Sequence, residues 1–67
     1  MWQVGDRIEL VAMPDDPNPV RKGTRGTVRE VMLEYPRHDQ TVLAVDWDDG
    51  RTLNVVLPLD QIKLVAP

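Results

Sequence analysis

The positions of the prolines constrain this chain more than any other feature of its sequence. Three of the six prolines fall within residues 13–19, and the others stand at positions 36, 58 and 67. Proline removes a backbone donor and clashes with the preceding helical turn, so residues 13–22 are predicted to be a loop. Good helix formers at 29–35 are followed by Pro36, which limits any helix there to under about two turns. We therefore expect a core built from strands.

Apolar and polar residues alternate along several segments, which is the period of a half-buried strand. The predicted strands cover residues 6–11, 26–33, 41–47 and 51–57, and residues 63–65 close the sheet. The second strand should be bent or bulged, because Val28 and Val31 break strict alternation. Val4, Leu57 and Trp47 join the predicted inward set, and a buried Trp47 would need a partner for its indole N–H. The positions predicted to form the interior are Ile8, Leu10, Val28, Leu43, Val45, Leu53 and Val55.

The connections carry recognisable turn residues. Gly23 and Gly26 indicate a tight turn with positive φ or a close backbone approach. The run 48–50, Asp-Asp-Gly, predicts a hairpin in which Gly50 is left-handed and the aspartates stabilise the turn. Residues 35–40 form a polar connector, Pro58 ends the fourth strand, and residues 59–62 suit a single 3₁₀ turn.

These elements together predict an all-β fold, an SH3-like small barrel of about five strands with a long Pro/Asp-rich first loop and a 3₁₀ turn before the last strand. At 67 residues, only one domain fits, covering positions 1–67. The chain has no cysteine, so neither a disulfide nor a thiolate zinc site can supplement the small core.

Two stretches carry a resemblance to a known family. The first joins Gly-Asp-Arg-Ile-Glu-Leu-Val at 5–11 and Asp-Asp-Pro-Asn-Pro-Val at 15–20 to Gly-Thr-Arg-Gly-Thr-Val at 23–28, and the second is Val-Asp-Trp-Asp-Asp-Gly-Arg at 45–51. Together they resemble a small domain-of-unknown-function family of bacteria, phages and mobile elements, over nearly the whole chain. That resemblance implies no activity. The same segments resemble SH3-like modules of ribosomal and transcription factors, which supports the fold more than the function.

Charge and the absence of targeting signals narrow the function classes. The formal net charge is −3, which disfavours non-specific binding to nucleic acid. No segment approaches the ~20 apolar residues of a membrane span, and the first residues show neither the basic region nor the apolar run of a signal peptide. We expect a cytoplasmic protein that does not bind membranes.

The residues give no support for an enzyme or a metal protein. The chain contains neither Ser nor Cys, so serine and cysteine nucleophiles are excluded within one protomer. His38 is predicted to be an ordinary exposed loop residue, and the acids Asp46, Asp48 and Asp49 belong to a strand face and a turn. No cofactor and no metal is expected. A remote alternative is a pore enzyme like the plasmid-borne dihydrofolate reductase, an SH3-like barrel, but residues 54–56 lack the amide and phenol of its binding strand.

The function we expect is binding, most simply to a protein partner through the first loop and the barrel rim. A second copy of the chain is one candidate partner. SH3-like domains often bind peptides beside the long first loop, and rim aromatics commonly contact partners. The candidate partner-binding residues are Trp2, Met13, Asp15, Asp16 and Tyr35.

The alternative is a nucleic-acid accessory domain. Arg21, Lys22, Arg25 and Arg29 fall within nine residues that contain no acid, and guanidinium groups bind phosphates bidentately. The same four side chains could equally form a solvated strand face balanced by Glu9, Glu30 and Asp46, which protects against edge pairing. The acidic first loop weighs against nucleic acid.

Overall fold

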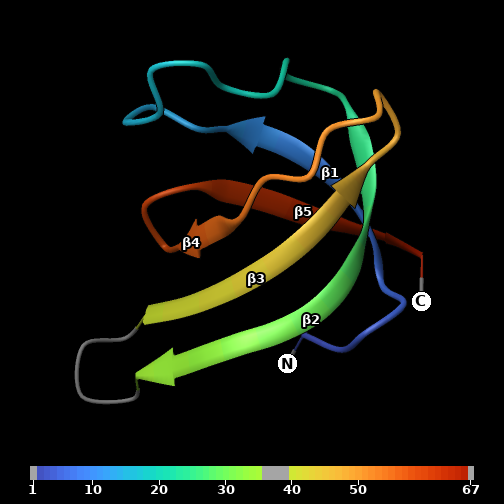
Figure 1. The fold of residues 1–67 in the computed structure, drawn as a ribbon, viewed down its shortest axis with the longest axis vertical. Coiled ribbons are helices and arrows are strands. Elements are labelled where there is room, and N and C mark those ends of the chain that lie inside the picture. The colour runs from blue at the N-terminus through green and yellow to red at the C-terminus, as the bar shows by residue number, and fades with distance from the viewer. Residues whose placement is uncertain (1, 36–39, 67) are drawn as a thin grey trace.

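The computed structural model describes residues 2–35 and 40–66, and these form one sheet of five antiparallel strands (Figure 1). The strands are β1 (Arg7–Ala12), β2 (Arg25–Tyr35), β3 (Gln40–Trp47), β4 (Val55–Leu57) and β5 (Gln61–Ala66). Their order is β4-β3-β2-β1-β5, so β5 returns across the molecule to pair with β1. The described residues contain no helix, and the all-β prediction is confirmed.

The apolar core lies on the inner face of this curved sheet. In Figure 1, β2 and β3 curve together, and β1 and β5 run at an angle to them. Ile8, Val28, Leu43, Val45 and Val55 are fully buried, as the alternation predicts. Leu10 is buried as well, and Met13, Val20 and Ala44 are further buried apolar residues. Leu53 is only half-buried, although it packs against the core with Trp2, Val31, Leu57 and Ile62.

The prediction for Val4 is wrong, because its side chain is 67% exposed. The chain before β1 is a turn: the Asp6 N–H donates to the Gln3 carbonyl at 3.1 Å, and Gly5 has a φ of 95°. Alternation applies only within a strand, so it does not extend back to Val4.

The predicted bend in β2 is confirmed. Its pairing with β3 changes register between Val28 and Glu30 and again between Val31 and Leu33. Each shift places an extra β2 residue against β3, which bends the strand and increases its twist. β2 therefore curves between its partner β1 at one end and β3 along its length (Figure 1).

The segment that follows the β3–β4 turn contains less β-strand than the sequence predicts. The sequence predicts one strand over residues 51–57, but β4 covers only Val55–Leu57, and Thr52 makes an isolated bridge to Asp46. Residues 58–60 form a turn, and β5 begins directly at Gln61, two residues before the predicted start. The predicted connector 35–40 lies mostly outside the described residues, and its ends, Tyr35 and Gln40, pair as the last and first residues of β2 and β3.

Gly23 and Gly26 meet different requirements. Gly23 has a φ of 90°, a conformation that disfavours any side chain, and it closes the turn before β2. A Cβ on Gly26 would lie 2.8 Å from Val45 Cγ1 and 2.9 Å from Trp47 Cε3. The first glycine thus permits a turn, and the second lets β2 pack closely on β3.

Candidate functional site

The loop between β1 and β2 is held in place at three points. Met13, its first residue, and Val20, in its second half, are 6% and 2% exposed and pack in the core. Between them, Arg51 Nη2 donates to the Asn18 carbonyl oxygen at 2.7 Å, which ties the loop to the β3–β4 connection. The Asn18 N–H also donates to Asp16 Oδ1 at 2.8 Å, a local bond that stabilises the turn. The loop backbone is therefore held in place, and its polar residues have defined positions.

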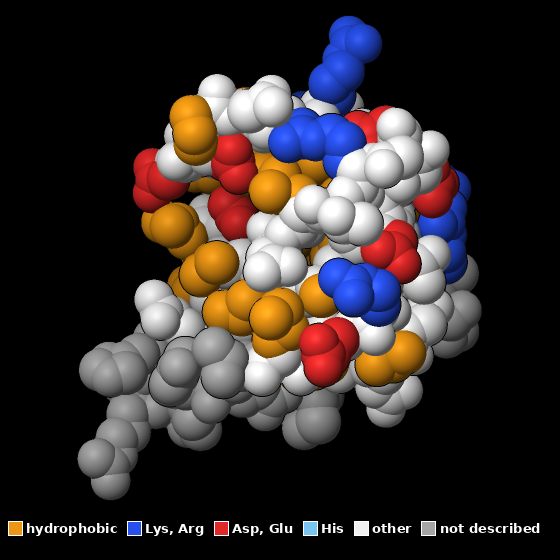
Figure 2. All heavy atoms as spheres, viewed as in Figure 1, with side chains coloured by type: hydrophobic (Ala, Val, Ile, Leu, Met, Phe, Trp, Pro, Cys, Tyr) orange, Lys and Arg blue, Asp and Glu red, His pale blue; other side chains and the backbone are white. Residues whose placement is uncertain are grey.

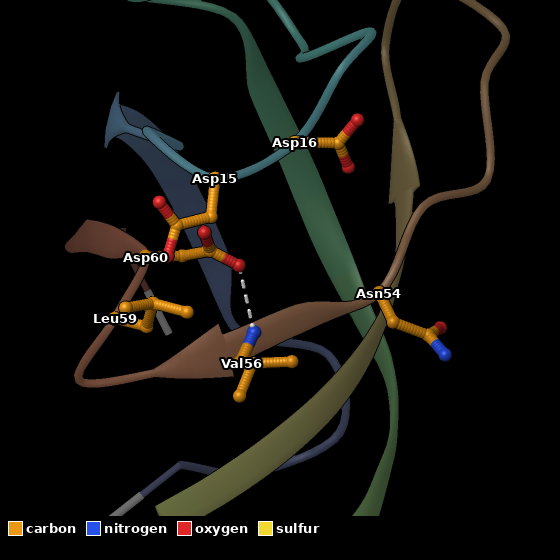
Figure 3. Close-up of a pocket in the computed structure, with 6 residues that line it drawn as sticks. All are labelled: Asp15, Asp16, Asn54, Val56, Leu59 and Asp60. Carbon is orange, nitrogen blue, oxygen red and sulfur yellow. Dashed lines mark hydrogen bonds between the residues drawn. The ribbon is translucent and has the colours of Figure 1, made fainter.

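A shallow cleft of about 170 Å³ lies between this loop, β4 and the β4–β5 turn (Figure 3). Val56 and Leu59 supply apolar surface, and Leu59 is 50% exposed. The remaining lining residues are Asp15, Asp16, Asn54 and Asp60. We call these six residues the acidic cleft. In Figure 2, acidic and hydrophobic side chains gather on the upper left, where Figure 1 places the β1–β2 loop.

Asp60 shapes the floor of the acidic cleft. Its side chain accepts a hydrogen bond from the Val56 N–H at 2.9 Å, and its own N–H donates to the Val56 carbonyl at 2.8 Å (Figure 3). This pair of bonds closes the turn after β4 and leaves Asp60 only 7% exposed. A carboxylate is thus fixed beside two apolar side chains.

The structure places the predicted partner-binding residues in different environments. Asp15 and Asp16 both line the acidic cleft, the first exposed and the second half-buried. Met13 packs in the core instead, so it does not line a surface groove, and Trp2 is half-buried against the same core. Tyr35 ends β2, and its side chain lies outside the described part of the chain.

Half of the basic run belongs to ion pairs across the outer face of the sheet. Arg25 Nε lies 3.3 Å from Glu9 Oε1, and Lys63 Nζ lies 3.2 Å from Glu9 Oε2. Hydrogen bonds from Lys63 and then from Arg25 lower the pKa of Glu9. Arg29 Nε lies 3.2 Å from Asp46 Oδ1. Glu9 and Asp46 are two of the three acids that the sequence suggested as balancing charges.

Arg21 and Lys22 are different, because both are exposed in the loop before β2. Within residues 2–35 and 40–66 neither forms an ion pair. The four basic residues therefore do not act as one uniform patch: two are neutralised on the strand and two stand in the loop.

The two acids of the β3–β4 turn differ, because Asp49 bonds within the turn, as the sequence predicts, whereas Asp48 pairs with Arg7 on β1. Asp48 accepts two hydrogen bonds from Arg7, at 2.8 and 2.6 Å, and this guanidinium lowers the pKa of the Asp48 carboxyl. Asp49 Oδ1 accepts from the Arg51 N–H at 2.9 Å, and Gly50 has a φ of 92°. Asp46 is exposed and points outward from β3.

The family of the chain follows from a comparison with protein-family models. The model described as Domain of unknown function (DUF4314) matches residues 1–65. The chain belongs to this family. The DUF4314 match covers both the first loop and the β4–β5 turn, and so the whole acidic cleft. Comparisons with curated proteins and with solved structures gave no match.

Metal ligands and membrane-spanning segments are the remaining features to place in this DUF4314 domain. In the part of the chain that the structure covers, no three His, Asp or Glu side chains are grouped so that they could hold a metal ion. His38 lies outside that part. No helix among the described residues is long and apolar enough to cross a membrane.

Sequence reasoning found two residues of the acidic cleft and missed four. Asn54, Val56, Leu59 and Asp60 are about 40 positions away from Asp15, and no motif connects them. One signal was available: an aspartate two residues after Pro58 suits a side chain that bonds to a nearby backbone amide in a turn. That signal predicts the turn of this DUF4314 domain but not the cleft.

Proposed function

We propose that this protein is a non-enzymatic binding module that takes a cationic segment of a protein partner in the acidic cleft. The observation that carries the proposal is the combination of a fixed loop, two apolar side chains and three carboxylates around one hollow. Loops held on a rigid sheet are where binding residues usually lie. A loop that is already ordered also loses little conformational freedom when a partner binds.

The proposal includes an SH3-like interpretation of the fold. Two features support it: β5 returns to pair with β1, and a long loop after β1 faces the turn before β5 across the acidic cleft. Small barrels of this kind commonly bind extended peptides beside that loop. The interpretation leads us to expect a peptide rather than a folded surface as the ligand.

The size and charge of the cleft indicate the chemistry of that peptide. At about 170 Å³ the hollow is smaller than the roughly 300–1,000 Å³ typical of small-molecule pockets. It suits one or two side chains. Asp15, Asp16 and Asp60 favour Lys or Arg, whose methylene stem can pack on Leu59 while its charged end meets the carboxylates.

Nucleic-acid binding is the weaker alternative. Arg25 and Arg29 would have to leave Glu9 and Asp46 before they could meet phosphates, and the acidic cleft would repel a phosphate backbone. Titration with duplex DNA and RNA tests it: a salt-dependent affinity, with a log-log slope of about −0.9 per phosphate contact on DNA, would favour this alternative over the protein partner.

A charge-matched pair of triple variants tests the cleft. The first is Asp15→Asn, Asp16→Asn and Asp60→Asn, in which each amide oxygen can still accept the hydrogen bond of the carboxylate it replaces. The control is Glu30→Gln, Asp46→Asn and Asp49→Asn. Both variants remove the formal net charge of −3, but only the first changes the cleft.

Binding is measured with peptides that place Lys or Arg beside Leu or Pro, selected on an array and then titrated into the ¹⁵N-labelled protein. We expect shifts centred on residues 15–16 and 54–60. The cleft variant should weaken binding by at least about tenfold, which corresponds to ~1.4 kcal/mol. Equal weakening in both variants would indicate unspecific attraction and contradict the proposal, as would the absence of any bound peptide.

A further inference from the structure

The outer face of the sheet has a charged part and an apolar part. Ion pairs around Glu9 and Asp46 join β5, β1, β2 and β3. The apolar part consists of Val56 on β4, Val42 on β3 and Met32 on β2, and we call these three residues the apolar strip. An antiparallel sheet usually turns polar side chains to the solvent, so an apolar row across three strands indicates a contact surface.

Strand pairing shows that the apolar strip is continuous. Val42 pairs with Val56, and the neighbouring pair, Leu43 and Val55, is fully buried in the core. Side chains alternate along a strand, so Val42 and Val56 face outward and lie side by side, both half-buried. On β2, the second shift in register makes Met32 an extra residue opposite Val42, and Met32 is 44% exposed.

Val56 joins the apolar strip to the acidic cleft, because it also lines that cleft beside Asp60 (Figure 3). Figure 2 shows hydrophobic side chains that continue from the acidic ones at the upper left toward the centre of the view, where Figure 1 places β4 and β3. Neighbouring strands are about 4.8 Å apart, so Met32 on β2 lies about 10 Å from Val56 on β4. Carboxylates therefore stand at one end of an apolar row.

We propose that the cationic peptide of the acidic cleft continues across the apolar strip, and that its residues two and four positions from the basic one are apolar and contact Val42 and Met32. This inference rests on the proposed function, because the basic residue sets the register. An extended peptide advances about 6.6 Å between side chains on the same side. Two such steps, about 13 Å, reach from the cleft beside Val56 to Met32. The peptide crosses the strands and does not extend the sheet at an edge.

Two capped peptides of the same composition test this spacing. The first, Arg-Gly-Leu-Gly-Leu, has leucine at the second and fourth positions after arginine. The second, Arg-Leu-Gly-Leu-Gly, places both leucines on the opposite side of an extended chain. Each peptide is also made with its sequence reversed, because the spacing is the same in both chain directions. Affinities are measured by titration into the ¹⁵N-labelled protein.

A double variant removes the apolar strip without changing a residue of the acidic cleft. Met32→Gln keeps the length of the side chain, and Val42→Thr keeps the β-branch that suits a strand. The matched control is Leu64→Gln with Val65→Thr, because these residues are 54% and 36% exposed on β5, at the other side of the sheet from β4. Circular dichroism checks that both variants fold.

In one chain direction, the wild-type chain and the control should bind the first peptide at least about fivefold more tightly than the second. The strip variant should bind both peptides equally. Equal affinities of the wild-type chain for both peptides in both directions would overturn the inference, as would a preference that the strip variant retains. Binding that the triple variant of the cleft still weakens would leave the proposed function intact in these cases, whereas the absence of binding by every peptide would overturn both proposals.

Discussion

Gly26 carries the tightest steric requirement among the glycines. It lies where β2 packs across β3, and a Cβ there would also come within 2.9 Å of the Asp46 carbonyl oxygen. One of these neighbours is backbone and another is the ring of Trp47, which is itself held by a hydrogen bond from Nε1 to the Leu53 carbonyl at 3.1 Å. The three neighbours of such a Cβ, which are Val45 Cγ1, the Asp46 carbonyl oxygen and the Trp47 ring, cannot move away without disturbing the core.

We therefore expect Gly26→Ala to lower the free energy of unfolding by about 1–3 kcal/mol, the usual cost of overpacking. Urea denaturation followed by tryptophan fluorescence measures it. Gly50→Asn is the control, because Gly50 has open space around its Cα and a φ of 92° that asparagine tolerates. It should cost less than about 1 kcal/mol. Equal losses in the two variants would show that close packing at Gly26 is not the cause.

Residue environments could be predicted where the local pattern decides them. The burial of Trp47, its need for a hydrogen-bond acceptor and the left-handed Gly50 all follow from alternation and turn chemistry. Val4 could not be predicted from alternation, because Gly5 and the Asp6–Gln3 hydrogen bond replace the strand by a turn. Met13 could not be assigned either, since a methionine beside a proline loop fits the surface as well as the core.

At the scale of elements, a long-range side-chain bond from Arg51 holds the middle of the β1–β2 loop. Arg51 donates to the Asn18 carbonyl from the β3–β4 connection, while Met13 and Val20 pack in the core on either side of Asn18 in the sequence. Loss of the Arg51 side chain should therefore free residues 14–19 without unfolding the sheet.

We expect Arg51→Ala to increase amide hydrogen exchange in the loop several-fold and to change the free energy of global unfolding by less than about 1 kcal/mol. Exchange is followed by NMR, residue by residue. Arg29→Ala is the control, because it removes an arginine whose ion-pair partner, Asp46, lies on β3 and not on the loop. Unchanged exchange at Asn18 in the Arg51 variant would show that the bond does not order the loop.

The strands were predictable because each has a period, and the ends of the last two were not. β4 lacks the first four residues of the predicted strand 51–57, where only Thr52 makes an isolated bridge to Asp46. β5 starts earlier than its pattern suggests, because the bonds between Asp60 and Val56 close a turn that alternation does not encode. The acidic cleft could not be predicted in full for a similar reason, because it depends on contacts that local alternation does not encode. Its loop half contains a recognisable Asp-Asp pair, whereas its other half is brought close only by the return of β5 to β1.

At the scale of the whole molecule, the outer face of the sheet is a set of charge pairs that joins four strands. Lys63 on β5, Glu9 on β1 and Arg25 on β2 form one group, and Arg29 on β2 pairs with Asp46 on β3. Arg7 on β1 also meets Asp48, beyond the end of β3. These contacts are exposed, so each one contributes little alone, and their common property is dependence on ionised carboxylates.

Stability should therefore decrease in acid. Unfolded Glu9 and Asp48 titrate near 4.5 and 3.8, and their partners lower both pKa values in the folded protein. The pairs contribute fully above these unfolded values, and the contribution is lost as the pH falls through the lowered folded pKa values. Urea midpoints measured from about pH 7 to about pH 2 should show this decline, and salt should reduce it.

Glu9→Gln supplies the comparison, because glutamine has no titrating proton. Its urea midpoint should depend less on pH than that of the wild-type chain over the acidic range. If the two curves have the same slope, the ion pairs of Glu9 do not contribute to the acid sensitivity.

Met13 and Val20 both fill the core from the β1–β2 loop, and this has a consequence for the residues between them. The stretch between them carries none of the buried apolar side chains, so its composition can be exchanged while the interior stays intact. A library randomised at residues 14–19 should therefore yield mostly folded proteins, and resistance of its members to proteolysis measures how many keep the native core.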